Sequence, residues 1–163
     1  TARVNNFVFQ NSTFNKIQAG ITSRNSSESI VIDGCTFSNF ILGGSGNYIF
    51  RYRGGDGNNN VTNGISIKNS IFGPGWDQSG TLTYAIRGID GLPTTNFEVV
   101  NVYSTSEFEF QAGREIPGFP VGNYGGSQTD LWVDPVNANN FNFKDTGFAG
   151  RFDTGDPRWR IRL

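Results

Sequence analysis

The side chains with the clearest potential for chemistry are Arg53, Arg87 and Gln111, because each follows a short segment of alternating apolar and polar residues. In an extended strand, alternate residues point to opposite faces, so inward-facing aromatic or branched residues leave the following polar residue facing outward. Asp56 and Asp90 come shortly after the two arginines. We align the segment ending at Arg53 with those ending at Arg87 and Gln111, and expect the three side chains to stack outward on successive strands.

Such a column is suited to binding carboxylate groups. Parallel strands stand about 4.8 Å apart, which is close to the rise per sugar along an extended polysaccharide, and the planar guanidinium group binds carboxylates bidentately. We therefore expect these five residues to contact a uronate-containing polysaccharide such as pectin. The alternative is that each Asp pairs with an Arg and stabilises the turn after its strand.

Exposed aromatic rings are a second carbohydrate-binding feature, because sugar faces stack on flat rings. Trp76 stands in a Gly-Pro-Gly-Trp loop, and we expect it to contact ligand unless the loop folds back over the core. Tyr48 and Tyr124, both close to glycines, are further candidates.

An enzyme is the main alternative function. A lyase acting on uronates needs a cation, commonly Ca²⁺, and a base such as Arg or Lys. The carboxylates are scattered, and the calcium-like segment 56–60 is followed by Val61 and Ile67 where a calcium loop needs Gly and Glu. We therefore expect no catalytic residue, no bound metal and no cofactor, with Ca²⁺ required only by a lyase.

If the chain is a lyase or hydrolase fragment, its active site would use Arg53 and Arg87 together with the two carboxylates of Asp56 and Asp90. Two facing carboxylates could support glycoside hydrolysis. The absence of histidine removes a Ser-His-Asp triad and a histidine-held metal. The one cysteine, Cys35, aligns with small residues of other repeats and is expected to be a buried side chain rather than a nucleophile.

The composition limits the partners. The 13 basic and 14 acidic residues give a net charge of −1, and binding to a phosphate backbone needs a basic face, so we expect no nucleic-acid partner. No apolar run reaches membrane-spanning length. The chain starts at Thr1 within a strand-like pattern, so we expect a piece of a longer, secreted or surface-anchored protein, with a monomer favoured.

A repeat predicts the fold. Five segments share a template of alternating apolar residues, a turn residue, a small residue and an aromatic: residues 7–14, 30–37, 65–72, 97–103 and 141–148. The turn residue is Asn, Gly or Asp, which tolerate left-handed backbone. We predict one all-β domain over residues 1–163, a right-handed parallel β-helix with coils to about residue 130 and the last coil and cap in 131–163. An antiparallel sandwich is the alternative.

The C-terminal part has the most distinctive sequence. Leu131-Trp132-Val133-Asp134-Pro135 leads to a final Gly155-Asp156-Pro157-Arg158-Trp159-Arg160. This ending resembles pectate-lyase-like β-helix modules of extracellular proteins and lipoproteins from polysaccharide-utilising Gram-negative bacteria, many of them domains of unknown function. The resemblance implies a β-helix, a secreted or outer-surface location and a polysaccharide ligand, without implying catalysis.

The same segment is expected to act as a lid. The open apolar end of stacked strands must be covered, and Trp132, Phe148 and Trp159 could cover it, with Asp156 pairing to Arg158 or Arg160. Taken together, the sequence predicts a non-catalytic polysaccharide-binding module. A lyase or hydrolase fragment and a structural spacer are the alternatives.

Overall fold

The first four repeated segments form parallel strands in a computed structural model that describes residues 3–43, 46–54, 59–78 and 85–162. The largest sheet has seven strands. They are β1 (Asn6–Gln10), β2 (Thr13–Ile17), β4 (Ser29–Asp33), β5 (Thr36–Phe40), β7 (Ile65–Phe72), β9 (Phe97–Ser104) and β10 (Gly122–Asn123).

The predicted register of the first four repeats is confirmed. Phe7 pairs with Ile30, Ile30 with Ile65, and Ile65 with Phe97, always in parallel. Because side chains alternate along a strand, this register stacks the apolar positions of four strands on one face. We call each set of strands at one height in this stack a level, numbered from the N-terminus.

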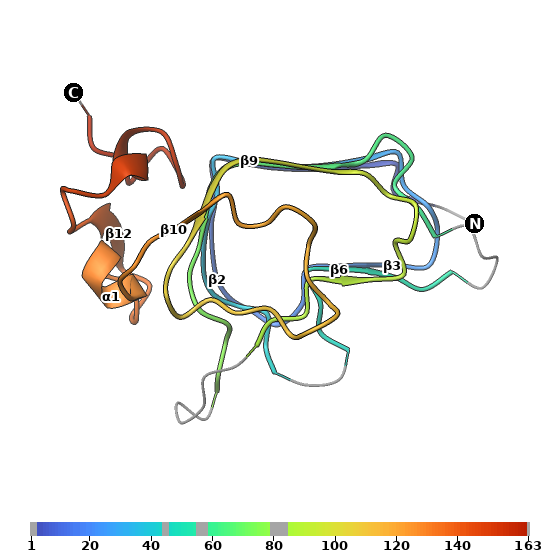
Figure 1. Ribbon diagram of the computed structural model, residues 1–163, viewed down its shortest axis with the longest axis horizontal. Helices are drawn as coiled ribbons and strands as arrows, with labels where there is room; N and C mark the ends of the chain where they lie inside the picture. Colours follow the sequence, from blue (N-terminus) through green and yellow to red (C-terminus); the bar gives the residue numbers. More distant parts are fainter. Residues whose placement is uncertain (1–2, 44–45, 55–58, 79–84, 163) are drawn as a thin grey trace.

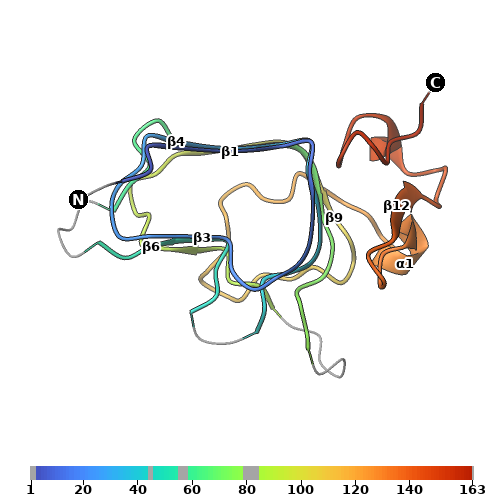
Figure 2. The same ribbon diagram turned by 180° about the vertical axis from the view of Figure 1, so that it is seen from behind.

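A second parallel sheet faces the first. It consists of β3 (Ile21–Ser23), β6 (Phe50–Tyr52) and β8 (Ile89–Asp90), in that order. Figures 1 and 2 show β1, β4 and β9 on one side of the molecule and β3 and β6 on the opposite side. The apolar side chains of both sheets meet between them in one cluster that includes Ile30, Ile65, Ile67, Phe50 and Tyr52.

The turn residues adopt the left-handed backbone that the template requires. Asn11, Gly34, Asn69 and Asn101 have φ between 48° and 64°. The amide of Asn101 donates to the side-chain oxygen of Asn69 (3.1 Å), and the amide of Asn69 donates to the carboxylate of Asp33 (2.8 Å). Asn and Gly therefore shape the turn, and the polar side chains also connect one level to the next.

The fifth repeat does not follow the others. Phe141 lies in β12 (Asn140–Phe143), which pairs antiparallel with β11 (Trp132–Asp134) in a sheet of two strands. The helix α1 (Gln128–Leu131) precedes this pair, and the 3-10 helix η1 (Ala149–Phe152) follows it. The template thus predicts a strand at Phe141 correctly and its parallel neighbour wrongly.

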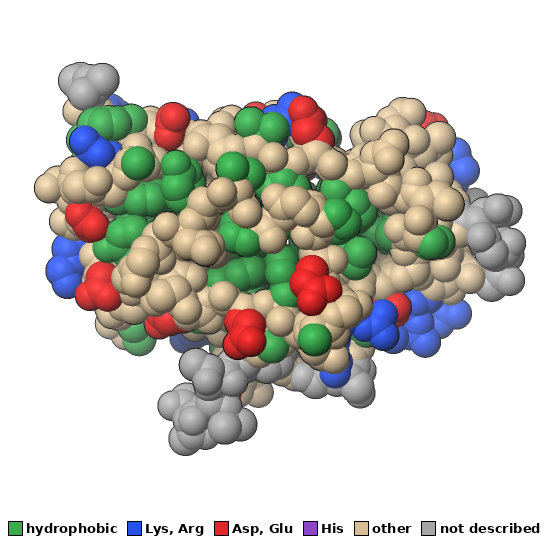
Figure 3. Space-filling model, viewed as in Figure 1, with side chains coloured by type: hydrophobic (Ala, Val, Ile, Leu, Met, Phe, Trp, Pro, Cys, Tyr) green, Lys and Arg blue, Asp and Glu red, His purple; other side chains and the backbone are tan. Residues whose placement is uncertain are grey.

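The C-terminal segment lies beside the stack instead of closing its end (Figure 1). Its apolar side chains, Leu131, Trp132, Phe141 and Phe148 among them, pack around Ile71 of β7. Figure 3 looks along the stack onto one of its ends. Apolar side chains are visible there, and the C-terminal segment lies to one side. The predicted lid is therefore a lateral cover.

The predicted fold class needs correction. The described strands form three separate sheets, one of them antiparallel, and the C-terminal segment does not cap the stack. A single right-handed β-helix running through residues 1–163 is therefore wrong. The structure is all-β and sandwich-like, with a seven-stranded parallel sheet facing a three-stranded parallel sheet.

The C-terminal segment is fastened by a set of contacts that we call the latch: Thr13, Thr36, Asp156, Arg158 and Trp159. Asp156 is fully buried, and its carboxylate accepts hydrogen bonds from Thr13 Oγ1 (2.8 Å) and Arg158 Nη2 (2.6 Å). Its backbone N–H donates to Thr36 Oγ1, and Trp159 Nε1 donates to Thr13 Oγ1. The predicted pairing of Asp156 with Arg158 is confirmed.

The charge on Asp156 is stabilised by this setting. Burial alone would raise the pKa of the carboxyl group, but the hydrogen bonds from Arg158 and Thr13 outweigh it and the net pKa is lowered. Arg160 has another role, since its guanidinium donates to the carbonyl of Gly155 (2.7 Å). Gly155 has φ +73°, and a Cβ there would stand 2.7 Å from Thr36 Oγ1, so the turn requires glycine.

Within the described residues, no helix has the length and hydropathy needed to cross a membrane.

Candidate functional site

The candidate site lies on the outer face of the three-stranded sheet. Phe50 and Tyr52 of β6 are buried, so Arg51 between them faces outward. Arg51 pairs in register with Asp90 of β8 on the third level. The N–H groups of Gly88 and Ile89 donate to the carbonyl of Arg114, which therefore lies on the fourth level. The backbone stacks three charged residues on consecutive levels.

Three arginines converge on one aromatic ring. The guanidinium carbons of Arg51, Arg87 and Arg114 lie 5.2, 5.8 and 5.7 Å from the centre of the Tyr48 ring. These distances are in the range of cation–π attraction. We call Tyr48, Asp90 and these three residues the arginine cluster. Figure 3 shows Lys and Arg side chains gathered beneath the part of the sheet that contains β3 and β6.

Asp90 lies between two of the arginines. One carboxylate oxygen accepts from Arg51 Nε (3.3 Å) and the other from Arg114 Nη1 (3.1 Å). Arg87 Nε donates to Gln111 Oε1 (2.7 Å), and Arg51 Nη1 donates to the carbonyl of Gly46 (3.0 Å). These contacts orient the guanidinium groups.

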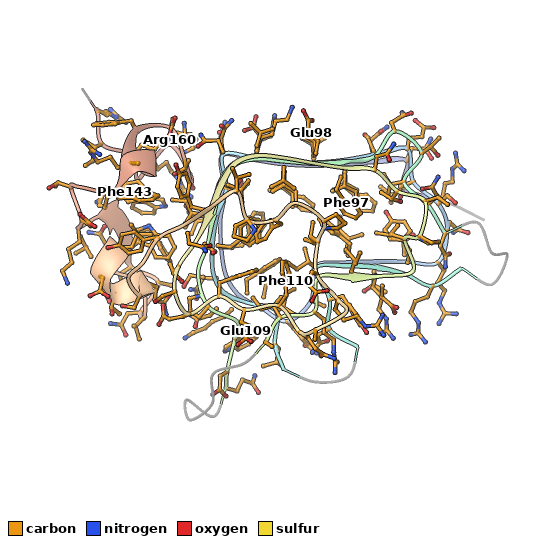
Figure 4. All side chains as sticks on the ribbon, viewed as in Figure 1. Phe97, Glu98, Glu109, Phe110, Phe143 and Arg160 are labelled. Carbon is orange, nitrogen blue, oxygen red and sulfur yellow. The ribbon has the colours of Figure 1, made fainter. Side chains whose placement is uncertain are left out.

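The cluster holds three positive charges and one negative charge, an excess of two. The side chains of Arg51, Asp90 and Arg114 are 20%, 29% and 41% exposed, so solvent reaches them. Two carboxylates stand nearby in the sequence. Glu115 accepts from the N–H of Gly113, and Glu109 projects from the lower side of the molecule in Figure 4.

The structure brings together only part of the predicted site. Arg87, Gln111 and Asp90 are in or beside the cluster, and the predicted alignment of Arg87 with Gln111 is confirmed because the residues before them, Ile86 and Phe110, pair in parallel. Arg53 is exposed, and within the described part of the chain it has no hydrogen bond to the cluster. Asp56 lies outside the described residues.

The predicted alignment of Arg53 with Arg87 is wrong. Phe50 pairs with Ile89, whereas aligning Arg53 with Arg87 would place Phe50 opposite residue 84. Gly88 explains the difference, because a Cβ there would stand 2.5 Å from the carbonyl of Arg114, and the close approach interrupts the regular alternation between Ile86 and Ile89.

The predicted exposed aromatics also differ from their expected positions. Trp76 is half-buried in a parallel bridge with Leu42, and no described contact joins it to the arginine cluster. Tyr48 is only 7% exposed, with its ring beneath the arginines. Tyr124 packs on Phe148, and its hydroxyl donates to Asp145. The pKa of Tyr124 is raised to about 12, chiefly by burial and secondly by the Asp145 carboxylate.

Sequence reasoning missed Arg51, Arg114 and the role of Tyr48. Arg51 stands at an outward position between Phe50 and Tyr52, so the alternation of inward and outward side chains along a strand could have identified it. Arg114 follows Gly113 in an irregular segment, and nothing in its neighbouring residues predicts its return to Asp90. Contacts of this kind are visible only in three dimensions.

Cys35 and an apolar cavity are two other places where chemistry could occur. Cys35 is buried as predicted, and burial raises the pKa of its thiol to about 11, which keeps it protonated at neutral pH. A cavity of about 150 Å³ at the first levels is lined by apolar side chains, including Phe9, Phe14 and Ile17, and by glycine. Among the described residues, no group of three or more acidic, cysteine or histidine side chains is arranged to hold a metal.

Comparison with known proteins gives one match. The family described as Domain of unknown function (DUF5123) matches residues 30–159, a range that contains the arginine cluster and most of the latch. The searches of curated proteins and of solved structures each gave no match. Because the family match spans well over half of the chain, this protein belongs to the family described as Domain of unknown function (DUF5123).

Proposed function

We propose that this domain binds acidic polysaccharide without cutting it, as a module of a secreted or outer-surface protein. The observation that carries the proposal is the convergence of Arg51, Arg87 and Arg114 on one tyrosine ring with a single carboxylate among them. Guanidinium groups held by neighbouring contacts lose less entropy when they bind a carboxylate than free side chains would.

An extended ligand is favoured over a small anion because the charged residues follow the stacking direction. Arg51, Asp90 and Arg114 occupy three consecutive levels, and levels of parallel strands repeat about every 4.8 Å. A sugar chain lying along this direction can place successive sugars against successive levels. The resemblance of the C-terminal sequence to pectate-lyase-like modules predicts the same class of ligand.

The affinity is expected to be modest. Partly exposed charge contacts contribute about 1 kcal/mol each, so a few of them give a dissociation constant of roughly millimolar. Salt weakens binding because the charges are within reach of solvent ions.

The test is a binding measurement on wild type and on the double variant Arg51→Ala with Arg114→Ala. Calorimetric titration with polygalacturonate and with a neutral galactan should show binding of the acidic polymer alone, and the double variant should lose it. Arg162→Ala is the matched control, because it removes an exposed arginine from the C-terminal segment and should leave binding unchanged.

Three outcomes separate the proposal from its alternatives. Unsaturated sugar products in the presence of Ca²⁺ would show a lyase and overturn the non-catalytic proposal. Equal affinity for acidic and neutral polymers would mean that the arginines do not select charge. Absence of binding across a broad glycan array would favour a structural spacer.

A further inference from the structure

The arginine cluster has an alternating order of charge. Arg51 on the second level is followed by Arg87 and Asp90 together on the third and by Arg114 on the fourth, so the second and fourth levels are positive and the two charges of the third offset each other. One oxygen of Asp90 contacts Arg51 and the other contacts Arg114. Besides orienting these two arginines, Asp90 offsets the charge of Arg87 on the third level and leaves the second and fourth levels cationic.

We infer that the site selects a polysaccharide in which acidic sugars alternate with neutral ones, and that Asp90 is the residue that sets this selectivity. The inference rests on the proposed function and deepens it. The backbones of Arg51 and Arg114 lie two levels apart, a spacing of about 10 Å, which corresponds to two sugars of an extended chain, and their guanidinium groups lean toward each other because both contact Asp90. A carboxylate can then face each arginine while the neutral sugar between them faces Asp90.

Asp90 discriminates in two ways. Its carboxylate accepts hydrogen bonds, so it can accept from a sugar hydroxyl on the neutral unit. It also repels an acidic group in the same place, because like charges brought close together oppose binding. A chain that carries charge on every sugar also brings negative charge close to Asp90. Its affinity should therefore be lower than its charge density alone suggests. We therefore expect an alternating acidic polymer to bind better than polygalacturonate, in which every sugar carries a charge.

The experiment compares two polymers that share one backbone. Chondroitin carries an acid on every second sugar, and chondroitin sulfate adds charge to the neutral sugars. Wild type should bind chondroitin at least as tightly as chondroitin sulfate in calorimetric titrations at low salt. Asp90→Asn keeps the shape of the side chain and removes its charge, so it should tighten binding of chondroitin sulfate about fivefold and change binding of chondroitin much less.

Glu98→Gln is the matched control. Glu98 is also an exposed carboxylate paired with a cation, Lys68 (2.9 Å), but it projects from β9 on the opposite side of the molecule (Figure 4). This variant makes the same charge change and should leave both affinities as in wild type. An equal gain in Glu98→Gln and Asp90→Asn would mean that overall charge matters and Asp90 does not.

The outcomes also distinguish this inference from the proposed function. If wild type binds chondroitin sulfate far more tightly than chondroitin, the site follows charge density and the alternation is wrong, while acidic-polysaccharide binding stands. If neither of these polymers nor polygalacturonate binds, the proposed function itself fails, and with it the inference.

Discussion

Two Arg–Asp groupings in this protein have the same chemistry and opposite settings. In the latch, Asp156 is fully buried and receives hydrogen bonds from both Thr13 and Arg158. In the arginine cluster, Asp90 remains partly exposed and is outnumbered by three arginines. A carboxylate with every partner supplied by the protein stabilises the fold. A cluster with surplus positive charge at the surface can bind an external anion.

The largest expected effect is on the latch. Asp156→Ala should lower the free energy of unfolding by about 3 kcal/mol, because it removes the buried carboxylate that accepts hydrogen bonds from the Thr13 hydroxyl and the Arg158 guanidinium. Urea denaturation followed by tryptophan fluorescence measures the change. Asp153→Ala, an exposed acid three residues earlier, is the control and should have little effect. Similar stability of the two variants would show that the latch does not hold the segment in place.

A pH titration sharpens the same point. The folded pKa of Asp156 is lowered, so its stabilisation is present above the unfolded pKa near 4 and is lost as pH falls through the folded value. The stability difference between wild type and Asp156→Asn should therefore be full at pH 6 and shrink as the pH falls below about 4. A difference that stays constant from pH 6 to pH 2 would contradict the assigned role of the ionised carboxylate.

The arginine cluster should respond much less in stability. Arg51→Ala combined with Arg114→Ala is expected to lower the free energy of unfolding by about 1 kcal/mol or less, because partly exposed ion pairs contribute little. The same urea titration measures it, and the loss of polysaccharide binding should be far larger than this structural cost. If the double variant unfolds as readily as Asp156→Ala, the cluster is a structural element and the comparison between the two regions fails.

The sequence predicted the large sheet because its signals agree with one another. Phe7, Ile30, Ile65 and Phe97 each begin an alternating segment and are followed by Asn or Gly at the same offset, so both the inward face and the register were determined. Phe141 begins a similar segment, yet it pairs with β11 because the chain supplies an adjacent antiparallel partner after a short turn. A pattern of alternation specifies a strand but not the direction of its neighbour.

The site was predictable only in part. The alternation of apolar and polar residues aligned Arg87 with Gln111 correctly, since Ile86 and Phe110 before them pair in parallel. The alignment failed at Arg53 because Gly88 interrupts the alternation and changes which residues face one another. Tyr48 looked exposed beside its glycines, whereas guanidinium groups from its own level and from the next two levels cover its ring.

The hydrogen bond between Thr13 and Asp156 joins positions 143 residues apart in the chain. During synthesis, Thr13 on the first level emerges long before Asp156, so the stack can form before the latch closes. Contacts between distant positions slow folding because the loop they close must be ordered first. Closure of the latch should thus be a late step, and a chain stopped before residue 156 should expose the Ile71 face to aggregation.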